Sequence, residues 1–408
     1  VPAAPHRPWA TPHPWGSDRV GDGAARPLTS TSGAMSSPVP SSVAKPRSPR
    51  RVRRRGGGGA PESSHGLDLY ERMVLIRRFE EEVERQYKRA RIGGYCHLAS
   101  GQEAATVGVV HPMREDDLLF SSYRTHGLAL ARDVDPDAVM AELFGREGGS
   151  AHGRGGSMHL LDTSRGYLGG WGIVGGQLPL AVGAGLALAY KRRRAAVVCE
   201  LGDAATNIGA WHESLNLAAI WDLPVVFVIF NNQYGMGTSV EKASGEPELY
   251  KRAAAFRMHG ERVDGQDVEA VLGVADRLLR RARDERKPAV LEVITYRYRG
   301  HSVADAGTAY RTREEMEAWM ARDPIQIYRR RLLAERRAGE AQLEAVEARV
   351  AKRVEQAVEA AEASPEPAVD SLAQHLYGDP RSAQQFSRMG PGSPWGEREL
   401  VLGGGLGR

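Results

Sequence analysis

Two short polar segments, each at the end of an apolar stretch, are the residues of this sequence best suited to hold a metal ion. Gly202-Asp203 follows the apolar residues 196–201, and Asn231-Asn232 follows the apolar residues 225–230. A carboxylate oxygen, an amide oxygen and a nearby backbone carbonyl are hard ligands that suit Mg²⁺, which keeps its other octahedral positions for phosphate oxygens and water. The sequence therefore predicts a magnesium site between Asp203 and Asn232.

A parallel sheet would bring these two segments together. Residues 196–201 and 225–230 are apolar without alternation, and a helical pattern at 210–221 separates them. Because a strand–helix–strand unit needs about thirty residues, Asp203 and Asn232 should lie at the carboxyl ends of neighbouring strands, where open α/β sheets bind ligands. The alternative, that Asp203 only caps the helix that begins near Ile208, stays open at this point.

The same alternation of helices and strands extends along the chain. The pattern indicates helices over residues 67–90 and 267–283, a strand over 289–296, and a helix over 336–364 that ends at Pro365. Unalternated apolar strands separated by helices imply an α/β fold, with a parallel sheet that carries helices on both faces.

This pattern occupies only the middle of the 408 residues. Residues 1–65 are rich in Pro, Arg, Gly and Ser, and we expect disorder there because such a segment buries too little apolar surface to offset the entropy of ordering. The expected α/β domain covers 66–335, followed by a helical segment at 336–377 and a tail at 378–408. We also expect Met35 to be the natural start of the chain.

Charge and cysteine usage argue against several classes of protein. The net charge of +4 comes from arginines crowded into residues 47–55, which favours a solvated segment and no nucleic-acid binding. The two cysteines, Cys96 and Cys199, match no metal-ligand spacing, which favours a reducing compartment, and Cys199 should be buried. Residues 166–190 lack charge, but their glycines and Pro179 interrupt the apolar run that a membrane span needs. We therefore expect a cytoplasmic protein without a membrane segment.

Small residues recur on one side of the helix expected after this glycine-rich turn. Ala181, Gly185 and Ala189 follow one another at every fourth position. Because glycine costs about 1 kcal/mol in a helix interior, close packing should compensate for it. We expect that packing to lie across a subunit boundary.

The segments around Asp203 and Asn232 resemble those of thiamine-diphosphate enzymes, in which a Gly-Asp-Gly is followed further along by Asn-Asn. The likeness is closest to the alpha subunits of the decarboxylating component of 2-oxo acid dehydrogenases, in particular those that act on pyruvate. It runs from about Leu69 to about Pro324. The stretches that carry it include Cys96-His97-Leu98, Gly101-Gln102-Glu103-Ala104, Tyr123-Arg124-Thr125-His126-Gly127, Gly155-Gly156-Ser157-Met158-His159, Gly172-Ile173-Val174-Gly175, Tyr296-Arg297-Tyr298-Arg299-Gly300-His301-Ser302 and Tyr310-Arg311-Thr312-Arg313-Glu314-Glu315.

The resemblance implies a metal and cofactor site. Asp203, Asn232 and the carbonyl of Tyr234 would hold Mg²⁺. Tyr123 and Arg124 would contact the diphosphate, where an arginine can make charge-assisted hydrogen bonds.

The resemblance also assigns the residues around the rest of thiamine diphosphate. Gly172 and Val174 would line its central bend, and Ala204, Ala205 and His301 would contact it. Two residues would act as catalytic proton donors or acceptors, and two further histidines are expected only as neighbours of the site. The catalytic pair is His97 and His301, and the neighbours are His126 and His159.

The implied reaction is the oxidative decarboxylation of pyruvate, with transfer of the acyl group to a lipoyl group on a dihydrolipoamide acyltransferase. Members with two kinds of chain take an essential glutamate from a beta subunit, so the resemblance implies an α/β heterotetramer. No second parallel-sheet pattern follows residue 324, which agrees with a partner of that kind. The alternatives are a branched-chain 2-oxo acid or acetoin dehydrogenase alpha subunit, or a non-catalytic subunit.

Two positions depart from the family pattern. Ala204 stands where the family has glycine, and a methyl group would cost on the order of 1 kcal/mol if the position needs a positive φ or contact with phosphate. We therefore expect weakened cofactor binding. Ser302 and Ser239 occupy positions that are phosphorylated in mitochondrial members, whereas Ala309 replaces a third serine; the sequence implies no kinase.

Overall fold

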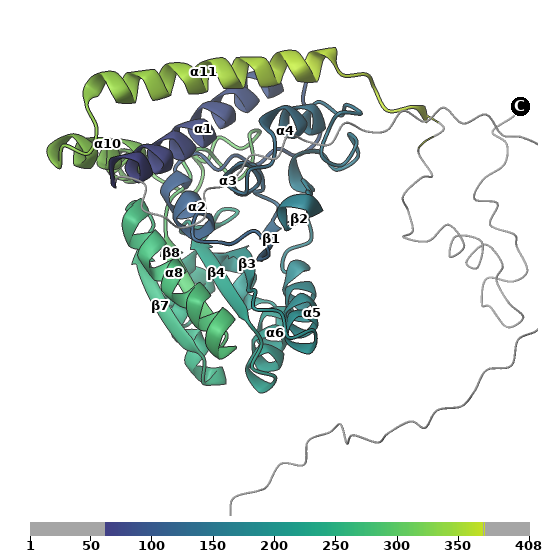
Figure 1. Cartoon of the computed structure of the whole chain (residues 1–408), viewed down its shortest axis with the longest axis vertical. Helices are drawn as coiled ribbons and strands as arrows, with labels where there is room; N and C mark the ends of the chain where they lie inside the picture. Colours follow the sequence, from purple (N-terminus) through teal and green to yellow (C-terminus); the bar gives the residue numbers. More distant parts are fainter. Residues whose placement is uncertain (1–61, 370, 372–408) are drawn as a thin grey trace, which may run out of the picture. The chain divides into compact units, whose positions relative to one another are not determined.

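The computed structural model of the protein describes residues 62–369 and 371 (Figure 1). Residues 1–61 of the expected N-terminal extension, the start at Met35 and the tail at 378–408 lie outside these residues. Residues 62–65, which were expected to be disordered, instead form the start of a helix that begins at Glu62. Among the described residues, the main sheet has the strand order β2-β1-β3-β4-β8-β7, and each neighbouring pair is parallel. This is the expected α/β fold.

The main sheet is built from six strands, and a small antiparallel hairpin follows the fourth. The residues that strands β3, β4 and β8 contribute are almost entirely buried, as expected for the centre of a parallel sheet. The strands are β1 (Leu118–Ser122), β2 (Tyr167–Trp171), β3 (Val197–Gly202), β4 (Val225–Asn231), β5 (Tyr234–Gly235), β6 (Thr238–Ser239), β7 (His259–Asp264) and β8 (Ala289–Ile294).

Helices cover both faces of the sheet, and the C-terminal helix α11 lies alongside α1 and α4 (Figure 1). The α-helices are α1 (Glu62–Lys88), α2 (Glu103–Val110), α3 (His126–Ala131), α4 (Pro136–Leu143), α5 (Gln177–Tyr190), α6 (Gly209–Ile220), α7 (Val240–Ala243), α8 (Val268–Glu285), α9 (Arg313–Met320), α10 (Pro324–Ala334) and α11 (Glu340–Ala363). The 3₁₀ turns are η1 (Gly156–Met158), η2 (Thr163–Arg165), η3 (Asp203–Asn207) and η4 (Leu249–Phe256).

Alternate residues of the central strands enter two separate cores. Val197 and Phe227 pack with α5 and α6 on one face of the sheet. Val198 and Val226 pack with α2 and α8 on the other. Because successive side chains of a strand point to opposite faces, a strand buried on both sides needs apolar residues throughout, which explains the unalternated runs in the sequence.

The small-residue side of α5 packs inside the chain. Ala181 and Gly185 are buried, and a Cβ at position 185 would lie 2.6 Å from Cγ2 of Val225. The close approach is therefore to the start of β4, and the expected packing of these residues across a subunit boundary was wrong. Leu180 and Leu186, on the opposite side of α5, are each 43% exposed.

Two further expectations concern Asp203 and membrane spans. Asp203 begins the turn η3, and the N-cap of α6 is Ile208, so the capping alternative for Asp203 is wrong. Within the described part of the chain, every helix is too short or too polar to cross a lipid bilayer.

Candidate functional site

Strand register brings the two predicted metal-binding segments together. Gly202 of β3 pairs with Phe230 of β4, so the residues that follow each strand meet at the carboxyl edge of the sheet. A pocket of about 240 Å³ opens there. The expected site residues that line it are Tyr123, Arg124, Val174, Asp203, Ala204, Ala205, Asn232 and Tyr234.

Asp203 and Asn232 place buried side chains with oxygen ligands at the pocket, and the amide oxygen of Asn232 lacks a hydrogen-bond partner. Both side chains are buried, and burial raises the pKa of Asp203 to about 6, although backbone hydrogen bonds and the charge of Arg297 lower it. The Nδ2 of Asn232 donates to Oε1 of Gln102 (3.1 Å), which directs the amide oxygen the other way. That oxygen is buried without a hydrogen-bond partner. Since an unpaired buried acceptor is unfavourable, the arrangement suits a cation.

The carbonyl of Tyr234 already has one donor in the structure. Nη1 of the buried Arg297 donates to this oxygen (2.8 Å), and Nη2 donates to the carbonyl of Met236. A carbonyl oxygen has two lone pairs, so it can accept this bond and still coordinate a metal ion. Arg297 thus fixes the hairpin strand β5 that carries the third expected ligand.

Ala204 has an ordinary backbone conformation. It is absent from the residues with positive φ, so the backbone strain considered for this position does not arise. The expected weakening of cofactor binding stays a prediction. Its methyl group faces Gly235, where an added Cβ would lie 2.3 Å from the Cβ of Ala204. The missing side chain at Gly235 therefore makes room for Ala204, and the methyl group remains exposed at the pocket.

Tyr123 and Arg124 follow β1 and connect the pocket with the expected catalytic histidines. The guanidinium of Arg124 donates to the carbonyls of Leu98 and His301, the latter at 3.0 Å. It thereby joins the segments that contain His97 and His301. The ring of Tyr123 contacts both histidine rings and also lines the pocket.

His97 and His301 lie against each other beside the pocket. Their ring centroids are 5.0 Å apart, and the centroid of Tyr123 is 4.6 Å from His97 and 5.7 Å from His301. Burial and the positive charge of Arg124 lower the pKa of His97 to about 3 and that of His301 to about 4. Both rings are therefore neutral near pH 7, and the Nδ1 atom of each is buried without a hydrogen-bond partner.

Gly172 does not belong to the residues that line the pocket, whereas Val174 does. A Cβ at Gly172 would lie 3.1 Å from the ring of His159, whose Nδ1 bonds to the carbonyl of Gly170 (3.0 Å). Position 172 is therefore close to a neighbouring side chain. His126 lies buried beneath the site, next to Glu80 and Ser157.

Several pocket residues were not assigned from the sequence. Gln102 and Arg297 lie inside the stretches that resemble the family, so the resemblance is the signal that could have assigned them. Glu200 could have been found in another way, because a charged residue inside an apolar strand is unusual. Its carboxylate accepts bonds from the backbone N (2.8 Å) and Oγ (3.3 Å) of Ser122, and burial raises its pKa to about 7.

Comparison with known proteins agrees with this geometry. Residues 71–370 match the family described as the dehydrogenase E1 component. The chain belongs to this family. The resemblance found in the motifs is thus confirmed, and with it a family that depends on thiamine diphosphate.

Three relatives illustrate the similarity of the chain. It is 40% identical over 320 residues to "Pyruvate dehydrogenase E1 component subunit alpha" of Porphyra purpurea, covering 77% of this chain and 93% of that protein. It is 41% identical over 319 residues to the protein of the same name from Rhizobium meliloti, covering 78% and 91%. The human testis-specific mitochondrial form is 40% identical over 333 residues, covering 81% and 84%.

Most of the ligands expected at the metal site are uncharged. Among residues 62–369 and 371, no group of three or more His, Cys, Asp or Glu side chains is arranged to hold a metal ion. Asp203, Asn232 and the Tyr234 carbonyl supply only one charge between them. Such a set suits an ion that also binds phosphate oxygens.

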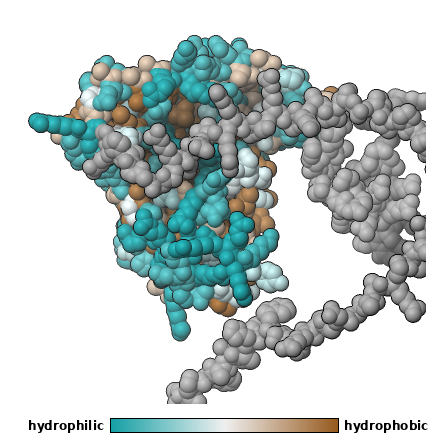
Figure 2. Space-filling view, viewed as in Figure 1, coloured by the Kyte–Doolittle hydropathy of each residue, from teal (hydrophilic) through white to brown (hydrophobic). Residues whose placement is uncertain are grey.

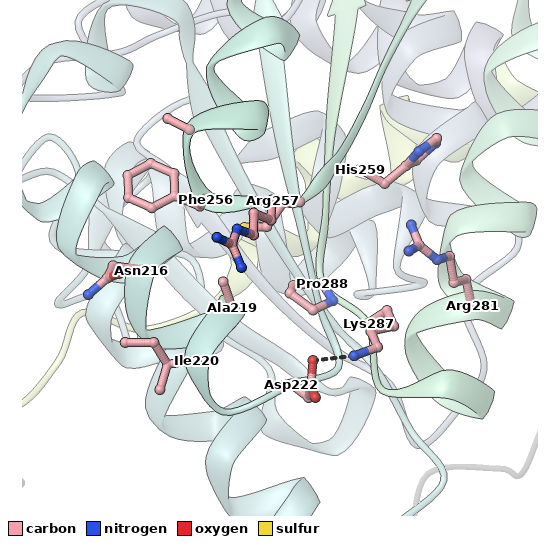
Figure 3. A pocket seen from close by; sticks show the side chains of 12 residues that line it. Asn216, Ala219, Ile220, Asp222, Phe256, Arg257, His259, Arg281, Lys287 and Pro288 are labelled. Atoms are coloured by element: carbon pink, nitrogen blue, oxygen red, sulfur yellow. Dashed lines mark hydrogen bonds and ion pairs between the residues drawn. The ribbon is translucent and has the colours of Figure 1, made fainter. Parts of the chain in front are cut away.

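A second, larger groove of about 560 Å³ lies at the opposite edge of the sheet, where β4, β7 and β8 begin (Figure 3). Arg257, Arg281 and Lys287 lie around it, and Lys287 donates to Asp222 (2.6 Å). Arg281 and Lys287 are near the C-terminal end of α8, where cations complement the partial negative charge of the last carbonyls. None of the expected site residues lines this groove.

Proposed function

We propose that this chain is the alpha subunit of a pyruvate dehydrogenase E1 component, which binds thiamine diphosphate through Mg²⁺ and decarboxylates pyruvate. The observation that carries the proposal is the buried, unpartnered Oδ1 of Asn232 beside Asp203 in a pocket at the carboxyl edge of the sheet. The relatives described above, which cover most of the chain, carry this name.

The proposed Mg²⁺ ligands are Asp203, Asn232 and the carbonyl of Tyr234. Tyr123 and Arg124 line the same pocket and would meet the diphosphate. Arg297, which is buried near Asp203, adds positive charge to this end of the pocket. When bound, thiamine diphosphate supplies a thiazolium carbon that attacks the keto group and a ring that accepts the electrons left by CO₂.

His97 and His301 would act on the substrate side. Because both rings are neutral near pH 7, each has one nitrogen that can accept a proton and one that can donate a hydrogen bond. Their mutual contact confines them to one side of the site. We assign them the proton transfers that accompany decarboxylation.

The site is proposed to be completed by a beta subunit. Val174 lines the pocket and is also 47% exposed, so the pocket continues onto the outer surface of the chain. The adjoining outer side of α5 carries Leu180, Leu186 and Tyr190, the last 88% exposed. Figure 2 shows brown and white side chains along the edge that carries α5, whereas the face over α8 is mostly teal. Exposed apolar surface of this kind marks a protein interface.

Calorimetry tests cofactor binding directly. The chain, co-expressed with a beta subunit, is titrated with thiamine diphosphate in the presence and absence of Mg²⁺. Asp203→Asn and Asn232→Ala should each weaken Mg²⁺-dependent binding by at least tenfold, because each removes a ligand from the ion. Asp222→Asn at the opposite edge of the sheet is the matched control. An α/β complex that binds no cofactor would refute the proposal and favour a non-catalytic subunit.

Substrate choice needs a separate measurement. Turnover of pyruvate and of 3-methyl-2-oxobutanoate by the α/β complex, with a lipoylated acyltransferase as acceptor, separates the proposed activity from that of a branched-chain enzyme. We expect kcat/KM to favour pyruvate. A preference for the branched substrate, or activity with acetoin alone, would reject the pyruvate assignment while keeping the cofactor site.

A further inference from the structure

Three buried side chains form a continuous hydrogen-bonded chain beneath the segment that contains His97. Oε2 of Glu80 in α1 lies 2.8 Å from Nδ1 of His126, and Nε2 of His126 lies 2.9 Å from Oγ of Ser157. Glu80 and His126 are fully buried, and Ser157 is nearly so. Water therefore cannot replace these contacts without opening the core.

Both ends of this chain bind the backbone on either side of His97. The N–H of His97 donates to Oγ of Ser157 (3.4 Å), and the N–H of Ala99 donates to Oε1 of Glu80 (2.7 Å). Thr125 fixes the position of Ser157, since its hydroxyl donates to the Ser157 carbonyl (2.7 Å). The position of His97 is thus determined by residues from α1, α3 and η1.

The chemistry of these groups determines which atom donates in each hydrogen bond. A carboxylate only accepts, so Nδ1 of His126 carries a hydrogen and donates it to Glu80. If the second nitrogen of His126 carries no hydrogen, Nε2 then accepts the hydroxyl hydrogen of Ser157. The oxygen of Ser157 also accepts the N–H of His97.

Few contacts other than these backbone bonds hold the ring of His97 in place. Its Nδ1 makes no hydrogen bond, and its ring contacts the rings of Tyr123 and His301. A shift of the backbone at position 97 would therefore move the ring directly. A displacement of about 1 Å at a reacting group can cost on the order of a hundredfold in rate.

We propose that Glu80 and His126 are positioning residues that hold His97 against Tyr123 and His301. This inference rests on the proposed function, because it assumes that His97 acts in decarboxylation. Glu80 and His126 touch no part of the cofactor pocket. Their effect passes through Ser157 and the backbone of residues 97–99.

Glu80→Gln is the sharpest test, because it keeps the size of the side chain. The amide can still accept from Ala99, but its NH₂ group faces the Nδ1–H of His126, which forces the ring to the other tautomer and reverses the bond to Ser157. In the α/β complex we expect kcat for pyruvate to fall roughly tenfold or more. The Kd for thiamine diphosphate and the KM for pyruvate should change less than about twofold.

A double-mutant cycle separates positioning from a general loss of stability. In a His97→Ala background, Glu80→Gln should lower kcat by less than about twofold, because its effect is transmitted through the missing ring. An equal loss in both backgrounds would overturn the proposal. Ser157→Ala, which removes a single hydroxyl from the same chain, repeats the test if Glu80→Gln fails to fold.

Tyr328→Phe is the control for destabilisation. It removes the hydroxyl of another buried side chain, which donates to Glu269 (3.0 Å) in α8 and has no connection with the histidines. Its Tm should fall, whereas kcat should keep its wild-type value. Loss of kcat in Tyr328→Phe similar to that in Glu80→Gln would count against positioning.

Histidine NMR of the chain without cofactor gives a readout that does not depend on activity. With the signals of His97 assigned by their loss in His97→Ala, Glu80→Gln and Ser157→Ala should both shift them, and Tyr328→Phe should not. Unshifted His97 signals would refute the proposal. If the signals shift but the wild-type complex fails to decarboxylate pyruvate, the proposed function fails and the positioning of His97 stands.

Discussion

Single buried residues of this protein serve the site through the groups they hold. Arg124 joins the segments of His97 and His301 through two backbone carbonyls, and Arg297 fixes the Tyr234 carbonyl. Guanidinium groups suit this task because their donors lie in a fixed plane. A bound diphosphate would meet Arg124 in a position already set by these bonds.

Glu200 makes a testable contribution at the residue scale. Burial raises its pKa from the usual 4.5 to about 7. Between these pH values the folded chain binds one more proton than the unfolded chain, so the free energy of unfolding decreases as the pH rises. Glu200→Gln removes this dependence, and its stability relative to wild type should improve by about 3 kcal/mol from pH 4.5 to 7.

Urea unfolding of both proteins across this pH range measures the effect. A constant offset from the amide facing the backbone N of Ser122 is expected, so only the change with pH is diagnostic. Glu241→Gln, at an exposed glutamate, should parallel wild type. Parallel curves for Glu200→Gln as well would show that Glu200 ionises normally.

Prediction from the sequence succeeded where function depends on strand ends and failed where it depends on side-chain packing. Asp203 and Asn232 could be placed because parallel strands end at a common edge. The partners Gln102 and Arg297 come from segments remote in sequence, and no periodicity encodes that contact. The backbone strain considered at Ala204 does not arise, because the local turn needs no positive φ there. The weaker cofactor binding expected from its methyl group stays a prediction.

At the scale of elements, the central strands β3, β4 and β8 were predicted, whereas β1 and the two edge strands, β2 and β7, were missed. The expected helix at 210–221 is α6 (Gly209–Ile220), and the expected strand at 225–230 is β4. β7 (His259–Asp264) was not predicted, because it lies at the edge of the sheet and is largely exposed, so its sequence contains polar residues. β2 was not predicted, because Gly169 and Gly170 interrupt its apolar pattern.

Glu142 determines the conformation of the glycine-rich loop that leads to Ser157. Its buried carboxylate accepts bonds from the backbone N of Ala151, Gly153, Gly155 and Gly156, at 2.7–3.1 Å. Glu142→Gln presents an NH₂ group to two of these donors and should destabilise the chain by about 3 kcal/mol. Trypsin should cleave more rapidly at Arg154, which is exposed in this loop.

The comparison for this loop is Glu147→Gln, since Glu147 is an exposed glutamate of the same loop. It should leave urea unfolding and the trypsin cleavage rate near wild type. Equal cleavage rates in the Glu142 and Glu147 variants would mean that the loop keeps its conformation without the carboxylate.

Helix α5 contains a matched pair of glycines on opposite sides. A Cβ at Gly185 would lie 2.6 Å from Cγ2 of Val225, whereas a Cβ at Gly183 would meet nothing within 4 Å. Gly183→Ala should stabilise the isolated chain by about 0.5–1 kcal/mol through helix propensity. Gly185→Ala should destabilise it by about 1–3 kcal/mol because the core is overpacked. Thermal unfolding of the two variants should give shifts in Tm of opposite sign.

At the scale of the whole molecule, the site occupies an edge that the elements described between residues 62 and 371 do not enclose. The pocket continues through Val174 to the outer side of α5, where each exposed position, from Pro179 to Tyr190, is uncharged. A monomer rarely exposes so continuous an apolar strip. We propose that a beta subunit covers this strip and encloses the cofactor.

Leu186→Glu tests this arrangement, since Leu186 lies on α5 at the centre of the strip and is 43% exposed. The charge can be solvated in the isolated chain, so its Tm should change little. In the assembled protein the carboxylate would be buried without a partner, so the α/β complex should dissociate in sedimentation and lose pyruvate turnover. Met320→Glu, at a methionine of α9 that is 45% exposed, is the matched control and should leave the complex intact. Because the pocket itself keeps all its residues in Leu186→Glu, a complex that stays assembled and active would place the partner on another face of the chain.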